Sequence, residues 1–358
     1  MLDQLPAEIC AYIFAFACQD SGHTGRSLSL VSKYIHETSK LARYTSIALI
    51  GRAQILAFAQ FLDQTPTQLG TRYLFIGGQE SEEEMDEICK LASRAQKEAQ
   101  AEYRKLVELP PSEDEKLKEA KDAVERERAN AKLYLDTFGK EGARAVTTIL
   151  RTLAPTLEIL DISLNERVAQ KMLHTISLPH LTDLTTRCGF PLHPTDDPVL
   201  EPTHSLRYLH VVETYDQWNW VEQFFECGIS YFAPSLTHLR LSQLAGDESA
   251  ITHLEAALGL SASASGRVKQ LPSTVELVLL KPDVAPPPYI GCFCTDDTVE
   301  YHNLLNRARQ LRDKEDHRVV LLQADTARPA EDEYFSEWMD KVNGAACRWD
   351  TSNVDTAR

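Results

Sequence analysis

The stretch LRYLHV at residues 206–211 is one of five copies of a pattern that decides the fold of this chain. Each copy has an apolar residue, two residues of any kind, a second apolar residue, a variable residue and, in four copies, a third apolar residue. The copies are LEILDI at 157–162, LTDLTT at 181–186, LRYLHV at 206–211, LTHLRL at 236–241 and VELVLL at 275–280. Short apolar runs are typical of buried strands, and starts 24, 25, 30 and 39 residues apart indicate a repeat.

Helical segments are expected in the gaps between these strands. The expected ranges are 143–153, 166–176, 217–226 and 248–258. A proline stands shortly before four of the five strands, where it would stop the preceding helix. One strand and one helix cannot bury their apolar faces alone, whereas stacked units form a continuous core. The sequence therefore predicts an α/β fold, an irregular repeat array with a curved parallel sheet over residues 143–325.

Upstream of the array lies a charged segment, residues 79–142. A capping box begins each of two helices in it, at 81–84 and at 112–115, and two prolines separate the helices. Apolar residues spaced by three or four form a thin, Ala-rich seam along both helices. We expect an antiparallel helical hairpin that Gly139 and Gly142 close, and we interpret it as a solvated structural insertion.

Residues 1–43 predict a small helical module. The segment ICAYIFAFAC at 9–18 contains ten consecutive apolar residues. A signal peptide would require basic residues before this segment, and none is present. Ten residues are also too few to span a bilayer. We therefore expect a buried helix. A second helix should follow it, with Leu28, Val31 and Ile35 on one face.

The remaining segments complete the expected domain plan. Residues 44–78 predict a linking strand, helix and strand between the module and the insertion. A helix near 297–312 and a strand at 318–323 should end the array. Residues 326–358, with a helix near 331–341, are expected to form a terminal cap and tail, since repeat arrays need such a cap.

Charge and cysteine usage exclude several classes of function. The chain has 53 acidic and 37 basic residues, a net charge of −16 that would repel phosphate backbones. Because no dense basic run is present, we expect no nucleic-acid partner. The eight cysteines are scattered, which favours reduced thiols in a cytoplasmic or nuclear protein over disulfides. We expect no membrane partner.

No motif in the chain predicts catalysis. A Gly-rich phosphate loop and a Gly-x-Ser-x-Gly elbow are both absent from the sequence. Cys292 and Cys294 with His302 are the best metal candidates, but no second cysteine pair follows at zinc spacing, so structural thiols are the favoured interpretation. The possible acid–base pairs, in charge-rich stretches typical of solvated surface, are Glu300 with His302 and Asp313 with His317. We expect no catalytic residue, no cofactor and no metal site; an uncharacterised hydrolase is a third hypothesis.

The N-terminal residues resemble an F-box. The matching elements are Leu5-Pro6-x-Glu8-Ile9, then Ile13-Phe14, then Leu30-Val31-Ser32-Lys33. With the following Tyr44-x-Ser-Ile-x-Leu strand, this version is similar to the large F-box-like families of mushroom-forming fungi. Ile35 departs from the family pattern, because a Trp commonly stands there. The repeated strands over roughly 143–325 resemble leucine-rich repeats.

This resemblance implies the substrate-recognition subunit of an SCF-type ubiquitin ligase. The F-box helices would dock a Skp-family adaptor and, through it, a cullin, while the repeat body would hold a client protein. The adaptor-contact candidates at matching positions are Leu5, Pro6, Ile9, Ile13, Phe14, Leu30, Val31 and Lys33. Packing within the module's own core is an alternative role for about half of them; for Ile9 and Val31 the two roles are equally expected.

The strands offer a second candidate surface. In such arrays the residues between the apolar positions face the open, concave side, where aromatic and Arg side chains are good interface anchors. The client-binding candidates are Asp161, Asp183, Arg187, Tyr208, His210, His238 and Arg240. Ordinary solvated strand residues are the alternative for each of them. An alternative for the whole chain is a repeat scaffold with no ubiquitin role, in which the N-terminal helices serve only as a cap.

Overall fold

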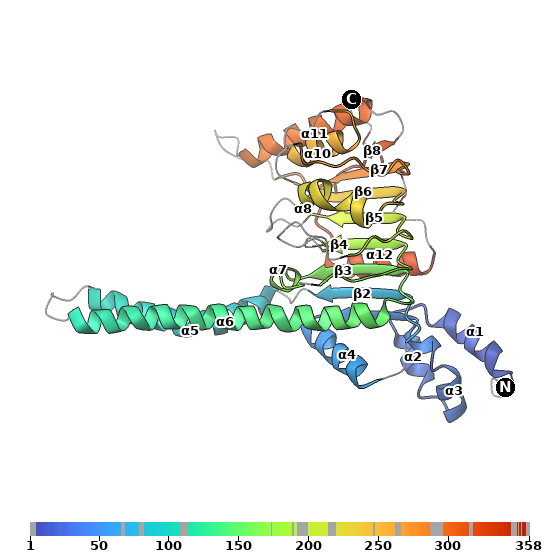
Figure 1. Ribbon diagram of the computed structural model, residues 1–358, viewed down its shortest axis with the longest axis horizontal. Coiled ribbons are helices and arrows are strands. Elements are labelled where there is room, and N and C mark those ends of the chain that lie inside the picture. The colour runs from blue at the N-terminus through green and yellow to red at the C-terminus, as the bar shows by residue number, and fades with distance from the viewer. Residues whose placement is uncertain are drawn as a thin grey trace.

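The computed structural model describes residues 5–65, 69–78, 82–107, 114–172, 174–187, 190–191, 200–213, 220–245, 248–261, 266–286, 296–314, 318–344, 349, 351 and 353–355. An eight-stranded sheet forms its centre, and every strand pairs in parallel with the next strand along the chain (Figure 1). The strands are β1 (Ser46–Ile50), β2 (Tyr73–Gly78), β3 (Ile159–Leu164), β4 (Asp183–Arg187), β5 (Tyr208–Val212), β6 (His238–Leu244), β7 (Leu277–Pro282) and β8 (Val319–Leu321). The expected α/β class with a parallel sheet is confirmed.

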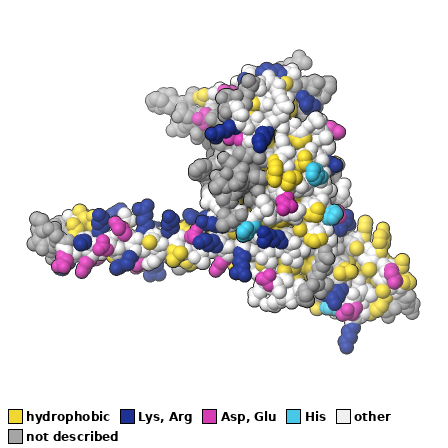
Figure 2. All heavy atoms as spheres, viewed as in Figure 1, with side chains coloured by type: hydrophobic (Ala, Val, Ile, Leu, Met, Phe, Trp, Pro, Cys, Tyr) yellow, Lys and Arg dark blue, Asp and Glu magenta, His cyan; other side chains and the backbone are white. Residues whose placement is uncertain are grey.

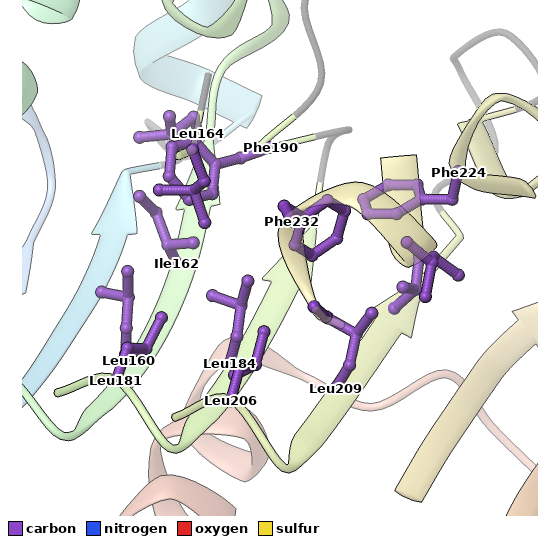
Figure 3. Packing of buried hydrophobic residues seen from close by; sticks show 14 of the residues in the cluster. Leu160, Ile162, Leu164, Leu181, Leu184, Phe190, Leu206, Leu209, Phe224 and Phe232 are labelled. Carbon is purple, nitrogen blue, oxygen red and sulfur yellow. The ribbon is translucent and has the colours of Figure 1, made fainter. Parts of the chain in front are cut away.

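The five copies of the sequence pattern form β3 to β7 in matching register. Leu160 pairs with Leu184, Leu184 with Leu209, and Leu209 with Leu239, so the second apolar position of each copy forms a row across the sheet. The first apolar position lies just before each strand; Leu181 and Leu206 fill this place and are fully buried. Figure 3 shows these leucines stacked from one strand to the next. The repeat therefore builds a core because equivalent leucines of neighbouring strands pack against one another.

Helices cover the face of the sheet to which these leucines point (Figure 1). They are α4 (Arg52–Gln64), α6 (Asp114–Leu153), α7 (Glu166–Ala169), α8 (Trp220–Gln223), a π-helical turn (Phe224–Gly228), α9 (Ile229–Phe232), α10 (Ser249–Ala257) and α11 (Asp296–Lys314). Apolar residues of α4, α6, α10 and α11 share one buried cluster with the strands. Among the described residues, the helix predicted at 166–176 is only the single turn α7. The one predicted at 217–226 is described from Trp220 on, where it is a series of short helical turns.

The charged hairpin consists of α5 (Glu82–Val107) and α6, and it projects far from the sheet (Figure 1). The predicted end of the hairpin at Gly139 and Gly142 is wrong, because α6 continues through both glycines to Leu153. Both positions lack room for a side chain: a Cβ on Gly139 would lie 2.6 Å from the Arg167 carbonyl oxygen, and one on Gly142 would lie 2.7 Å from Val168. The glycines allow α7 to approach α6 rather than ending the helix.

The C-terminal helix α12 (Glu331–Val342) does not cap the end of the array, as the sequence had suggested. It lies on the sheet face opposite the other helices, where its Trp338 packs on Phe75 of β2 (Figure 1). A short stretch of the tail is found at the last strand instead, where Val354 forms an antiparallel bridge to Leu322. The helix predicted near 331–341 is present, but its predicted place at the end of the array is wrong.

The N-terminal module contains α1 (Ala7–Ala17), α2 (His23–Leu28), α3 (Lys33–Thr38) and a 3-10 turn (Ala42–Tyr44) that leads into β1. Cys10, Phe14, Ile35 and Ala42 form its small core. The prediction of one helix carrying Leu28, Val31 and Ile35 is wrong, because the chain turns between α2 and α3. Among the described residues, no helix is long and apolar enough to cross a membrane.

Candidate interaction surfaces

Helix α1 leaves an apolar stripe uncovered, which we name the α1 stripe: Ile9, Tyr12, Ile13 and Phe16. The four residues are spaced by three, one and three, so they share one side of the helix. Their exposed fractions are 49% for Ile9, 78% for Tyr12, 41% for Ile13 and 73% for Phe16. The neighbouring side of α1, with Cys10 and Phe14, forms the module core instead. Helix α1 is thus only half buried, which corrects the expectation of a buried helix.

The turn between α2 and α3 adds two more exposed apolar residues, Leu30 at 80% and Val31 at 65%. The Ser32 side chain accepts a hydrogen bond from the Ile35 backbone N–H at 3.2 Å and so caps α3, which begins at Lys33. Leu30 and Val31 therefore stay outside both helices. Figure 2 shows hydrophobic side chains gathered over the N-terminal module, whereas the hairpin surface is largely charged.

The predicted adaptor-contact residues divide clearly by exposure. Seven of the eight are exposed: Leu5, Pro6, Ile9, Ile13, Leu30, Val31 and Lys33. The exception is Phe14, which is only 2% exposed and belongs to the module core, the alternative role expected for about half of these residues. For Ile9 and Val31 the exposure excludes the alternative of a place in the module's own core.

Local contacts hold the two ends of this surface in place. The Tyr34 hydroxyl donates a 2.7 Å hydrogen bond to the Leu5 carbonyl oxygen, which ties the start of the described chain to α3. The Asp20 carboxylate accepts bonds from the Gly22 and Thr24 N–H groups, at 3.0 and 2.8 Å, and so begins α2. A Cβ on Gly25 would lie 2.3 Å from the Arg43 carbonyl oxygen, so α2 packs tightly against the chain that enters β1.

The seven predicted client-binding residues do share one face of the sheet. Along each strand they alternate with the buried leucines, and the register places Asp161, Thr185, His210 and Arg240 in one row across β3 to β6. Arg187 donates to Asp161 at 2.9 Å, and His210 and Ser242 lie 2.8 Å apart.

Helix α12 covers most of this face, which corrects the expectation of an open surface. Asp161 is fully buried, Arg187 is 3% exposed and His210 is 1% exposed. Asp183 and Arg240 are buried as well. Because all five residues are buried, they are not accessible to a client in this structure.

Polar contacts accompany the apolar docking of α12. Lys341 pairs with Asp183 and donates to the Thr185 hydroxyl at 2.9 Å. Gln243 donates to the Tyr334 hydroxyl at 2.7 Å. The Arg187 guanidinium lies 4.2 Å from the centre of the Tyr334 ring, in a cation–π arrangement. Helix α12 therefore satisfies groups from β4 and β6 at two points along its length.

Tyr208 and His238 are the two predicted client-binding residues that stay partly exposed. Their rings lie 4.9 Å apart, and the Trp349 ring packs on both, at 5.4 and 5.3 Å. Burial lowers the pKa of His238, while nearby Glu276 acts in the opposite direction. The neutral ring is therefore favoured at this aromatic cluster.

Sequence reasoning missed three features of these surfaces: Tyr12, Phe16 and the covering position of α12. Tyr12 and Phe16 belong to the α1 stripe, and their helical spacing with Ile9 and Ile13 was a signal that could have identified them. No comparable signal predicts that α12 covers the sheet, because the apolar residues of a helix do not indicate which surface the helix packs against.

Within the described residues, no group of three potential metal ligands comes together. Cys292, Cys294 and His317 lie outside the described residues, and exposed His302 faces the Thr298 carbonyl oxygen at 2.6 Å. Burial, with the Asp20 carboxylate, raises the pKa of the Cys18 thiol to about 11, so this thiol is no nucleophile at neutral pH.

Comparison of the chain with protein-family models, with curated proteins and with solved structures found no match.

Proposed function

We propose that this chain is a non-enzymatic adaptor whose N-terminal module docks a Skp-family protein, as the substrate-recognition subunit of an SCF-type ubiquitin ligase. The observation that carries this proposal is the exposed apolar surface of the α1 stripe together with Leu30 and Val31. Large apolar side chains that gather on one small exposed unit mark a site of protein association.

The module's own packing supports a partner of this kind. Its core uses Cys10 and Phe14 on a side of α1 other than the stripe, and Ile35 and Ala42 from later elements. The exposed residues therefore contribute little to folding. Complete burial of an apolar side chain of this size contributes about 1.5–3 kcal/mol of free energy. A partner that covers them supplies that gain, and the exposed F-box-like positions are the ones at which the family resemblance places adaptor contacts.

The test is a titration of the chain with a purified Skp-family adaptor. The variant Ile9→Ala with Leu30→Ala removes two exposed anchors from different elements. At about 2 kcal/mol for an anchor, we expect at least a tenfold loss of affinity, with the melting temperature almost unchanged. Leu133→Ala is the matched control, since Leu133 is 64% exposed on the hairpin and should leave adaptor binding as it is.

Phe14→Ala separates folding from docking. Because Phe14 is buried, this variant should lower the melting temperature through the cavity that it creates. If the unaltered chain does not bind the adaptor, or if the Ile9 and Leu30 variant binds equally well, the adaptor function is refuted. A scaffold without a ubiquitin role would then be the better account.

A further inference from the structure

A basic groove lies where the hairpin meets the body, between α6 and the chain after α7. Its volume is about 370 Å³, and four cationic side chains line it: Lys140, Arg144, Arg151 and Lys171. His174 and two threonine hydroxyls complete the polar lining, and none of the lining residues is a carboxylate. In Figure 2, Lys and Arg side chains gather where the hairpin joins the body. In a chain with a net charge of −16, this is a local reversal of sign.

One wall of the groove is a straight row of cations on α6. Lys140, Arg144 and Arg151 are four and seven residues apart, so they follow one side of the helix. At 1.5 Å per residue the row is about 16 Å long. Placing like charges four residues apart on a helix costs stability rather than adding to it, by about 0.2–0.5 kcal/mol. Folding alone does not explain the row.

The second wall, with Lys171 and His174, follows α7, which approaches α6 over Gly139 and Gly142. Asp136 pairs with both Lys140 and Lys171, each at 2.6 Å. Hydrogen bonds from Lys140 and Lys171 lower the pKa of Asp136 to about 2, so its carboxylate stays charged and orients both ammonium groups.

The two arginines of the row differ from the lysines. In the described part of the chain, no carboxylate pairs with Arg144 or Arg151, and both side chains are exposed. Guanidinium groups bind carboxylates and phosphates through two parallel hydrogen bonds, which makes a free pair of arginines well suited to anionic side chains. The groove thus holds cations whose charge the described protein leaves uncompensated.

We propose that the basic groove binds an extended acidic segment of another protein. A row of about 16 Å matches about five residues of extended chain, at about 3.3 Å per residue, whereas a compact anion would meet only part of it. Carboxylates on alternate residues of such a segment would point to the same side and could meet Arg144 and Arg151 in turn. Nucleic acid fits less well, because no aromatic ring other than that of His174 lines the groove for base stacking.

A fluorescent ten-residue peptide with Glu at alternate positions and Ser between them is the probe. A peptide with Gln in place of each Glu is its uncharged control. The full-length chain should bind the Glu peptide, should bind it less tightly as salt is raised, and should bind the Gln peptide at least tenfold more weakly.

The double variant Arg144→Ala with Arg151→Ala should bind the Glu peptide at least tenfold more weakly than the unaltered chain. The matched control is Arg126→Ala with Arg128→Ala, which makes the same change in net charge at exposed positions of the same helix. This control should stay within about twofold of the unaltered chain, since distant exposed charges are screened. Equal losses from the two double variants would refute the groove as the site, and tighter binding of an oligonucleotide with the same charge would refute the acidic-peptide partner. The groove and the N-terminal module lie on different elements, so neither result bears on adaptor docking.

Discussion

Replacement of Trp338 by alanine tests whether α12 is a firmly docked part of the fold. Trp338 has no exposed surface, and its ring lies 5.6 Å from that of Phe75 on β2 and 5.8 Å from that of Phe335. Removal of a fully buried aromatic side chain costs about 3–5 kcal/mol, through lost burial and the cavity left behind. At about 2 °C per kcal/mol for a chain of this length, the melting temperature should fall by about 6–10 °C.

Urea unfolding followed by far-UV circular dichroism measures the change in the free energy of unfolding. Ser336→Ala is the control on the exposed side of α12 and should leave stability within about 0.5 kcal/mol of the unaltered chain. Hydrogen exchange supplies the local measurement. The Trp338 variant should increase the exchange rate of the amides of 334–342, relative to the unaltered chain, more than that of the amides of β4 and β5. A loss below about 1 kcal/mol, together with unchanged exchange in α12, would refute the docked position of this helix.

Two further predictions concern the hairpin and the aromatic cluster. Replacing residues 93–128 by a short glycine linker should leave the melting temperature within about 2 °C, because the described residues that are removed are mostly solvated. Extending the deletion through Phe138 should lower the melting temperature clearly. Phe138 is only 6% exposed, and its ring centre lies 4.2 Å from the Arg52 guanidinium. Because the pKa of His238 is lowered from 6.5 in the folded chain, protons favour the unfolded chain: the stability due to the neutral ring is complete above pH 6.5 and is lost as the pH falls through the folded pKa. Melting temperatures from about pH 7 to about pH 5 should therefore fall less for His238→Gln than for the unaltered chain, and parallel curves would contradict this cause.

The sheet was predictable because its signal is local and repeated. Leu160, Leu184 and Leu209 occupy the same place in successive copies, and the structure pairs them directly. The run of α6 through Gly139 and Gly142 was not predictable in the same way. Glycine commonly follows the end of a helix, whereas here the cause is the close approach of α7. Such a cause depends on a contact that the local sequence does not display.

The interaction surfaces were predictable only in part, for a related reason. Helix α1 carries apolar residues on two sides, and a periodic pattern cannot say which side the protein covers itself. The F-box-like positions included Phe14, which is core, and omitted Tyr12 and Phe16, which are exposed. On the sheet, alternation correctly placed Asp161 and Arg240 on one face, but the position of α12 over that face came from a segment more than ninety residues beyond Arg240.

The polar contacts of α12 explain why the helix has one position on the sheet. Its apolar side chains alone would allow a shift along the helix axis by one turn, about 5.4 Å, because Phe75 and Val212 would still meet apolar groups. Such a shift would separate Lys341 from Asp183, which is only 8% exposed, and would leave a buried carboxylate without its cation. Breaking a buried ion pair costs about 3–5 kcal/mol, far more than a displaced apolar contact. The hydrogen bond from Gln243 to Tyr334 would be lost in the same movement. The apolar residues of α12 thus supply most of its affinity for the sheet, and the pairs at its two ends fix its register.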